Sequence, residues 1–261
     1  MNTLSSSSTP QTQAPQGCAI VVGVGDIEGI GGAVASRFSK EGLHVYVVGR
    51  TQSKLDGVVA HIRAQGGHAT AVVNSLRDSQ DVDQLFDQVA RSGMQLKATI
   101  YNAAYLNAPR LFMNTPADFI EGNWRLTCLA GLMVGQSAAR LMLPQGHGTI
   151  IYTGATASMR GKPLFAAFAS AKAALRSFVL NLAHELAPQG IHVAHIVIDG
   201  VVDGQRGKSA FWGLGQLLMM IKGGEALIHP IHVADNYWQI HAQQRGAWSC
   251  ELELRPFKEK F

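Results

Sequence analysis

Apolar residues occur along this chain in short runs that alternate with longer segments of helical period. The short runs occupy residues 19–24, 44–49, 68–73, 97–102, 148–153, 191–198 and 248–254. The helical segments cover residues 29–40, 53–65, 78–92, 115–143, a stretch that contains Lys172 and ends near Leu186, and 231–243. Short apolar runs bounded by glycines predict buried strands, whereas the longer period predicts helices. The alternation predicts an α/β fold, a doubly wound parallel sheet of seven strands with helices on both faces.

Two helix starts carry a local signal. Ser53 is expected to cap the helix over residues 53–65, because a serine side chain can accept a hydrogen bond from the first turn. Pro116 stands in the first turn of the helix over residues 115–143, where its missing N–H costs nothing.

Length and composition favour one domain. The chain has 261 residues, of which 47% are hydrophobic and 15% are charged. The polar residues 1–17 are expected to form a disordered tail rather than a signal peptide, and residues 18–261 a single domain. No apolar run is expected to reach membrane-spanning length. So few charges indicate a surface covered in part by other chains or by neutral side chains.

Charge, cysteine and histidine usage exclude several classes. The net charge is +4 without a basic block, so nucleic-acid and membrane partners are not expected. The three cysteines are odd in number and far apart, which favours a reducing, cytoplasmic location over a disulfide framework. His192, His195 and His229 do not form a convergent set, and no metal site is expected.

A glycine-rich turn follows the first predicted strand. In "GDIEGIG", Gly25 is expected to make the tight turn, Gly29 to let the backbone approach a pyrophosphate, and Gly31 to let the helix pack on the sheet. A pyrophosphate is favoured at the helix N-terminus because of the unpaired N–H groups there.

The spacing GxxxGxG resembles that of the short-chain dehydrogenases/reductases. "YNAA" at residues 101–104 is similar to the family's turn after strand four, and residues 172–200 are similar to its stretch from the catalytic lysine to strand six. The resemblance covers about Ala19 to Asp203. It implies a Rossmann-like fold, NAD(P)-dependent oxidoreductase activity on a small molecule, and a homodimer or homotetramer. It also implies cofactor contacts from Gly25, Glu28, Gly29, Ile30, Gly31, Arg50, Ser75, Leu76, Asn102, Ala103, Lys172, Ile198 and Val201.

The end of the second predicted strand bears on the choice of nucleotide. NAD-binding members of the family usually carry an acidic residue at the position of Gly49. Gly49 followed by Arg50 favours NADP, since a guanidinium can pair with a 2′-phosphate. Asp26 and Glu28 would oppose that phosphate, which leaves NAD as the alternative.

The family's catalytic groups are largely replaced. Lys172 stands at the position of the lysine that binds the nicotinamide ribose, but Phe168 stands at that of the tyrosine acid. Ala155 replaces the substrate-orienting serine, and Cys128 the asparagine that holds a relay water. The usual acid–base step, on the order of 10²–10⁴-fold in rate, cannot use these positions. Lys172 as a surface lysine that lies along the helix is the plainer alternative.

Three hypotheses follow for this site. In the first, hydride transfer acts on an electrophile that needs no tyrosyl proton, such as a protonated imine. In the second, another group gives the proton; the candidates are Tyr101, Tyr105, Tyr152, Thr153, Thr156, Asp199 and Asp203. In the third, the protein binds a dinucleotide without redox chemistry, as a pseudoenzyme or a non-redox catalyst.

The apolar segment over residues 205–227 is the candidate substrate lid. It contains Phe211, Trp212, Leu214, Leu217, Leu218, Met219 and Met220, with glycines between them. A lid of this kind predicts a sizeable apolar substrate. A buried helix or a subunit contact explains the same residues equally well.

Overall fold

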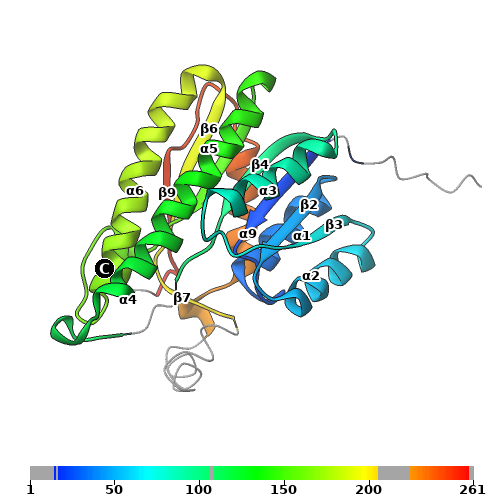
Figure 1. Ribbon diagram of the computed structural model, residues 1–261. Helices are drawn as coiled ribbons and strands as arrows, with labels where there is room; N and C mark the ends of the chain where they lie inside the picture. The colour runs from blue at the N-terminus through cyan, green and yellow to red at the C-terminus, as the bar shows by residue number, and fades with distance from the viewer. Residues whose placement is uncertain (1–14, 16, 106–108, 205–223, 259–261) are drawn as a thin grey trace, which may run out of the picture.

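The computed structural model describes residues 15, 17–105, 109–204 and 224–258, and its centre is one parallel sheet (Figure 1). The strand order is β3-β2-β1-β4-β5-β6-β9, and every neighbouring pair is parallel. The strands are β1 Gly17–Val22, β2 His44–Gly49, β3 His68–Val73, β4 Gln95–Tyr101, β5 Gly148–Thr153, β6 Ile191–Ile198 and β9 Glu251–Leu254. This is the doubly wound order, so the predicted fold class is confirmed.

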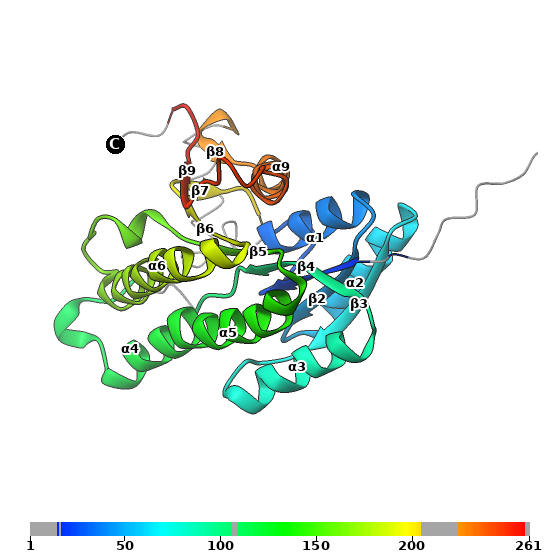
Figure 2. The ribbon, with the colours of Figure 1, turned by 90° about the horizontal axis from the view of Figure 1, so that it is seen from above.

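Helices cover both faces of the sheet, as the view from above shows (Figure 2). The helices are α1 Ile30–Lys40, α2 Gln52–Ala64, α3 Ser79–Arg91, α4 Ala117–Trp124, α5 Ala130–Met142, α6 Ala166–Leu186 and α9 Pro230–His241. One apolar core lies between the sheet and α3, α5 and α6, and a second lies between the sheet and α1, α2 and α9. Along β1, Ile20 belongs to the first core and Val21 to the second, which explains the uninterrupted apolar run.

Short elements lie between the main ones. A π-helical turn, Arg125–Leu129, joins α4 to α5, and the pair β7 Val201–Val202 and β8 Leu227–Ile228 was not predicted. The 3₁₀ turns are Phe112–Asn114, Leu143–Gln145, Thr156–Ser158, Ala187–Gln189 and Gly224–Ala226. The predicted lid residues Phe211 to Met220 lie outside the described residues.

Two expectations from the sequence are corrected. Ser53 does not cap α2, because it lies inside the helix; Thr51 precedes the first turn, and no side chain caps that turn. The segment Ala117–Gln145 is long and apolar enough to cross a membrane, which was not expected from the sequence. In the fold, 56% of its most apolar stretch is buried, and α5 packs against α3 and β4, so it is a core helix.

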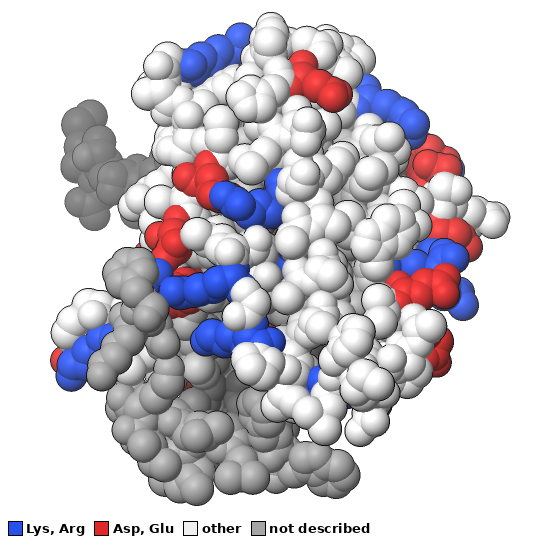
Figure 3. Space-filling view, turned by 90° about the vertical axis from the view of Figure 1, so that its left-hand side faces the viewer, with Lys and Arg blue, Asp and Glu red and all other residues white. Residues whose placement is uncertain are grey.

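Charged side chains are sparse on the surface. On the face shown in Figure 3, Lys and Arg side chains alternate with Asp and Glu across a largely neutral surface. Some exposed ion pairs lie within one helix, such as that of Arg125 with Glu121 one turn earlier, and others join distant segments, such as that of Lys258 with Glu225. The described surface on this side therefore lacks the single-sign block that a nucleic-acid surface would require.

Candidate active site

A cavity of about 620 Å³ lies at the carboxyl ends of β1, β2, β4, β5 and β6. Its position follows from the strand order, because β1 and β4 lie side by side while their connections leave in opposite directions. This volume falls in the range of ligand pockets. The cavity extends from the β2 side, through the glycine turn after β1, to the start of α6.

The glycine turn is built differently from the prediction. Gly23, not Gly25, takes the left-handed conformation, with φ +85°, and a Cβ there would lie 2.5 Å from the Ala103 nitrogen. A Cβ on Gly25 would meet nothing within 4 Å, so this position leaves open space in the cavity. Gly31 packs closely, since a Cβ there would lie 3.0 Å from the Gly23 oxygen.

The N-terminus of α1 faces this turn and suits a pyrophosphate. Gly29 precedes the first residue of the helix and lines the cavity together with Ile30 and Gly31. No side chain caps the helix, and its first turn holds no acidic residue. The first N–H groups of a helix lack intrahelical partners, so an anion can accept their hydrogen bonds. The residues present therefore fit the phosphates of a dinucleotide.

The β2 side of the cavity has a cationic rim. Gly49, Arg50, Ser75 and Leu76 line it, and a Cβ at Gly49 would overlap the backbone oxygen of Val24. An acidic side chain at position 49 would therefore require the backbone at Val24 to shift.

The two acids near this rim differ in position. Asp26 lines the cavity and pairs with Lys54 at 2.9 Å, which offsets its charge. Glu28 lies outside the cavity, beside a shallow depression formed with Ile27 and Ser53. Glu28 is therefore not among the residues that line the cavity, and its cofactor contact stays a prediction.

The other predicted cofactor residues lie around the centre of the cavity. Asn102, Ala103 and Ile198 line it, and the Asn102 side chain donates to the Gly23 oxygen at 3.2 Å. Val201 does not line it and is 37% exposed; its neighbour Val202 takes that place. Alternation along the strand explains the exchange, because adjacent side chains point to opposite sides.

Lys172, Phe168 and Ala155 meet at the β5 side of the cavity. Lys172 is 3% exposed, its Nζ donates to the Thr153 oxygen at 2.6 Å, and it lies 5.9 Å from the centroid of the Phe168 ring. This burial rules out a surface lysine. Neither Phe168 nor Ala155 carries a hydroxyl, so these two positions offer no proton to a ligand.

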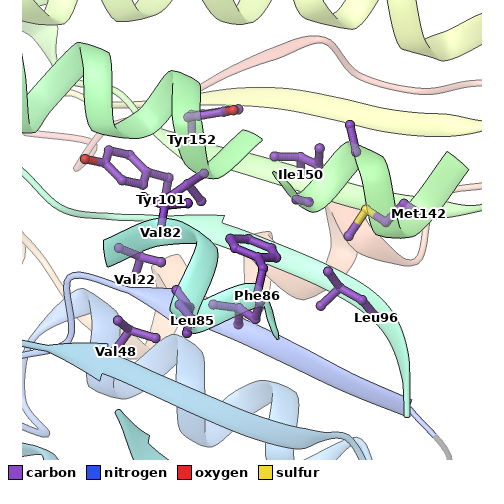
Figure 4. Packing of buried hydrophobic residues seen from close by; sticks show 14 of the residues in the cluster. Val22, Val48, Val82, Leu85, Phe86, Leu96, Tyr101, Met142, Ile150 and Tyr152 are labelled. Carbon is purple, nitrogen blue, oxygen red and sulfur yellow. The ribbon is translucent and has the colours of Figure 1, made fainter. Parts of the chain in front are cut away.

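Tyr101 and Tyr152 are buried in the first apolar core (Figure 4), and neither lines the cavity. The Tyr152 hydroxyl donates to the Gly131 oxygen at 3.2 Å, and the Tyr101 hydroxyl donates to the Leu126 oxygen. Burial raises the pKa of both phenols well above the usual value. The structure therefore does not bring Tyr152 into the site predicted for it.

The remaining candidate proton donors have partners of their own. The Thr156 hydroxyl donates to Asp199, and the Thr153 hydroxyl shares a hydrogen bond of 2.8 Å with Tyr237. Asp203 lies 3.6 Å from His229.

Tyr105 and Cys128 do not line the cavity. The Tyr105 ring packs on Phe119. Cys128 is buried in the π-helical turn, and burial raises the pKa of its thiol.

Several lining residues were not anticipated. They include Gly23, Lys54, Asn74, Leu126, Arg160, Lys162, Phe165 and Gly204. The sequence "GVG" at residues 23–25 places a second glycine just before Gly25, and this could have indicated Gly23 as the residue of the tight turn. Arg160 and Lys162 belong to the loop between β5 and α6, and nothing in their local sequence distinguishes them from surface cations.

A family model described as short chain dehydrogenase matches residues 18–210. The very-long-chain 3-oxoacyl-CoA reductase of Podospora anserina is 28% identical over 182 residues, which cover 69% of this chain and 53% of that protein. The 3-oxoacyl-[acyl-carrier-protein] reductase of Synechocystis is 30% identical over 170 residues, covering 65% and 68%. This chain thus spans about half the length of the very-long-chain reductase.

Solved structures agree with these matches. A short-chain dehydrogenase from Rhodopseudomonas palustris is 35% identical with a TM-score of 0.76, over 95% of this chain and all of that one. A metagenomic short-chain oxidoreductase in complex with NADP has a TM-score of 0.77 at 20% identity, over 93% and 98% of the two chains. The latter likeness concerns the fold alone.

Proposed function

Because the chain belongs to the short-chain dehydrogenase family, we propose that it is an atypical NADPH-dependent oxidoreductase that reduces an apolar C=N or C=O compound. The observation that carries the proposal is the group of three residues at the β5 side. Lys172 lines the cavity, whereas Phe168 and Ala155 remove the hydroxyls that the resemblance leads one to expect. The substrate then has to react without a proton from those positions.

The β2 side supports NADP as the cofactor. At position 49 an acid that would hold a ribose 2′-hydroxyl would require the Val24 backbone to shift, and Arg50 stands beside Gly49. Lys54 offsets the charge of Asp26, which removes the main objection to a 2′-phosphate. The metagenomic relative of the same fold was solved with NADP.

Lys172 and Phe168 have different roles in the proposed reaction. We assign Lys172 to a ribose hydroxyl, since its ammonium is buried at the cavity wall and already oriented by the Thr153 oxygen. The Phe168 ring offers an apolar surface that excludes water from the reacting atoms.

A reduced nicotinamide held in this cavity would supply the hydride. A protonated imine accepts that hydride at carbon, its C=N π electrons become the nitrogen lone pair, and a neutral amine forms without a further proton. A ketone would instead form an alkoxide, which needs an acid within reach. Phe168 cannot act as that acid, so this site favours an iminium over an unactivated ketone.

The alternative is a dinucleotide-binding protein that does not turn over. The hydrogen bonds of Thr153 to Tyr237 and of Thr156 to Asp199 favour it, because both hydroxyls near Ala155 are already engaged. It predicts tight NADPH binding and no oxidation of NADPH with any substrate.

Assembly and location complete the proposal. We propose a cytoplasmic homodimer or homotetramer formed by one domain over residues 18–261. The three cysteines are free, and Cys250 is exposed, as a reducing compartment allows. Exposed apolar side chains such as Leu111, Phe112 and Met113 leave surface for contacts between copies.

The decisive experiment compares wild type with Lys172→Met. NADPH binding is measured by calorimetry, and NADPH oxidation by its absorbance with cyclic imines and matched ketones. We expect imine-dependent oxidation in the wild type and about tenfold weaker NADPH binding in the variant. Equal affinities would remove the ribose role, and tight binding without oxidation would favour the non-redox alternative.

A second experiment restores the missing hydroxyls. The double variant Phe168→Tyr with Ala155→Ser should gain ketone reduction by on the order of 10²-fold or more if the rest of the site is intact. A variant that binds NADPH normally but still fails on ketones would show that other parts of the site differ as well.

A further inference from the structure

The β5 side of the cavity holds two cations that the proposed chemistry does not use. Arg160 and Lys162, in the loop between β5 and α6, line it. Among the described lining residues Asp26 is the one acid, and it lies on the β2 side next to Lys54. In the sheet order β2 and β5 are separated by β1 and β4, so the two cationic regions lie on opposite halves.

Arg160 is an oriented donor rather than a source of net charge. Its Nη2 donates to Asp199 Oδ2 at 2.8 Å, and Asp199 is 4% exposed. Arg255 lies 2.5 Å from the same oxygen and also pairs with Glu253, so these two arginines and two acids balance. Burial opposes the charge on Asp199, but the Thr156 hydroxyl and the two arginines outweigh it and lower the pKa of the carboxyl.

The guanidinium of Arg160 is thus held in place with donors to spare. One of its N–H groups serves Asp199, and in the described part of the chain it has no second acceptor. Its side chain is 37% exposed. A planar guanidinium fixed in this way suits a carboxylate, which accepts two parallel hydrogen bonds.

Lys162 supplies the net positive charge. It is exposed, and within the described residues it forms no ion pair. The backbone around it is fixed, since the Phe165 N–H donates to the Lys162 oxygen and the Arg110 N–H donates to the Leu164 oxygen at 2.9 Å. The loop therefore presents its cation to the cavity from a defined position.

The walls next to these cations are apolar. Leu126, Ala155, Phe165, Phe168 and Val202 line the same half. A wholly apolar ligand would leave Lys162 and the free donors of Arg160 without a partner at its edge. A ligand with an apolar body and one anionic end would satisfy both parts of the surface.

We propose that the substrate carries a carboxylate that is bound by Arg160 and Lys162 while its apolar body lies against Phe165 and Phe168. This inference deepens the proposed function and rests on it in taking this half of the cavity as the substrate's. It narrows the substrate class to amphiphilic imino or oxo acids with an apolar body.

The test measures binding without turnover. The full chain, with and without NADP⁺, is titrated by calorimetry with 2-naphthoate, with neutral 2-naphthamide and with 2-naphthyl phosphate. In the presence of NADP⁺ we expect naphthoate to bind about tenfold more tightly than naphthamide, and added salt to reduce the difference. Equal affinities of the acid and the amide, or preference for the phosphate over the carboxylate, would overturn the proposal.

Variants assign the effect to these residues. Lys162→Gln and Arg160→Gln should each weaken naphthoate binding about five- to tenfold and leave naphthamide unchanged. Arg140→Gln, an exposed cation at the far end of α5, is the matched control and should change neither. Lys162 is exposed, so its variant tests the site even if Arg160→Gln unfolds.

The outcomes separate this inference from the proposed function. NADPH affinity in Lys162→Gln should stay within about twofold of wild type, and a parallel loss would assign Lys162 to the cofactor and overturn the inference. Naphthoate binding through Lys162 in a protein that never oxidises NADPH would support the anion site while the redox proposal fails. Imine reduction at a rate that does not depend on a carboxylate in the substrate would support the redox proposal and overturn the anion site.

Discussion

Two leucines with positive φ stand at the margin of the cavity. Leu76, with φ +54°, lines it, and Leu164, with φ +74°, lies between the lining residues Lys162 and Phe165. A non-glycine residue in the left-handed region costs roughly 1–2 kcal/mol. Such strain persists where the surroundings fix the backbone, and at Leu164 the backbone oxygen accepts a hydrogen bond from the Arg110 N–H at 2.9 Å.

Replacing Leu164 should relieve this strain. Asparagine tolerates the left-handed region better, so Leu164→Asn should raise the free energy of unfolding by about 0.5–1 kcal/mol in urea denaturation. Leu111→Asn is the control, because Leu111 is also exposed but has φ −63°. A gain in the control as large as that at Leu164 would contradict the strain argument.

Gly49 gives a steric prediction at the same scale. Gly49→Ala should lower the free energy of unfolding by about 2–3 kcal/mol, because its Cβ would overlap the Val24 oxygen at the end of β2. In exposed Gly57 of α2 a Cβ meets nothing within 4 Å, and Gly57→Ala should stabilise the protein by about 0.5–1 kcal/mol. Denaturant titrations measure both, and a neutral Gly49→Ala would reopen the choice between NAD and NADP.

The element that shapes one wall of the cavity is the interrupted helix α4–α5. The π-helical turn between the two breaks the regular hydrogen bonding, and the Tyr101 hydroxyl donates to the Leu126 oxygen within it. Leu126 itself lines the cavity. The tyrosine at the end of β4 therefore holds this turn against the sheet.

Removing that hydroxyl should loosen the turn. Tyr101→Phe leaves a buried carbonyl with one donor fewer, and we expect a loss of about 1–3 kcal/mol in the free energy of unfolding. Tyr46→Phe is the control, since Tyr46 is also buried but its hydroxyl has no hydrogen bond to the described residues. Thermal denaturation measures the stability of both variants. Equal small losses of stability would mean that the hydrogen bond to the Leu126 oxygen does not stabilise the protein.

At the scale of the whole molecule, partly buried His241 packs beside the second core and has a lowered pKa. His241, at the end of α9, accepts or donates one hydrogen bond with Thr149 of β5 at 2.9 Å and packs against Phe38 of α1. Burial, and then the charges of His192, Lys97 and His147, lower the pKa of His241 to about 4. Burial also lowers the pKa of His195, which lies fully buried beside Glu251.

The protein should therefore lose stability in mild acid. The unfolded chain takes up the proton near the ordinary histidine pKa of about 6.5, whereas folded His241 takes it up only near pH 4. Its contribution is complete above pH 6.5 and is lost as the pH falls towards 4, by about 3 kcal/mol. Urea denaturation of His241→Gln should show a pH dependence weaker by that amount, while exposed His61→Gln keeps the wild-type slope.

The sequence predicted the seven strands within about three residues at each end. The inner strands are buried on both faces and therefore apolar, whereas the edge strands β3 and β9 are partly exposed and mix polar with apolar residues. The sequence also placed Lys172, Phe168 and Ala155, whose spacing in the chain is fixed by one helix and one turn. It did not identify Gly23, Lys54, Arg160 and Lys162 as residues that line the cavity. These residues lie near the cavity because of the order of the strands in the sheet, and the strand order cannot be read from the local sequence.

The sequence by itself determined the fold class, and it predicted the loss of two hydroxyls at Phe168 and Ala155, since both follow from residue types at fixed local spacing. Only the tertiary structure decided which other groups can act. Tyr152 is buried in the core and Thr153 bonds to Tyr237, while Lys172 is buried at the cavity wall. Direction, burial and the partners of a polar group arise from packing between distant segments, so they exist only in the folded chain.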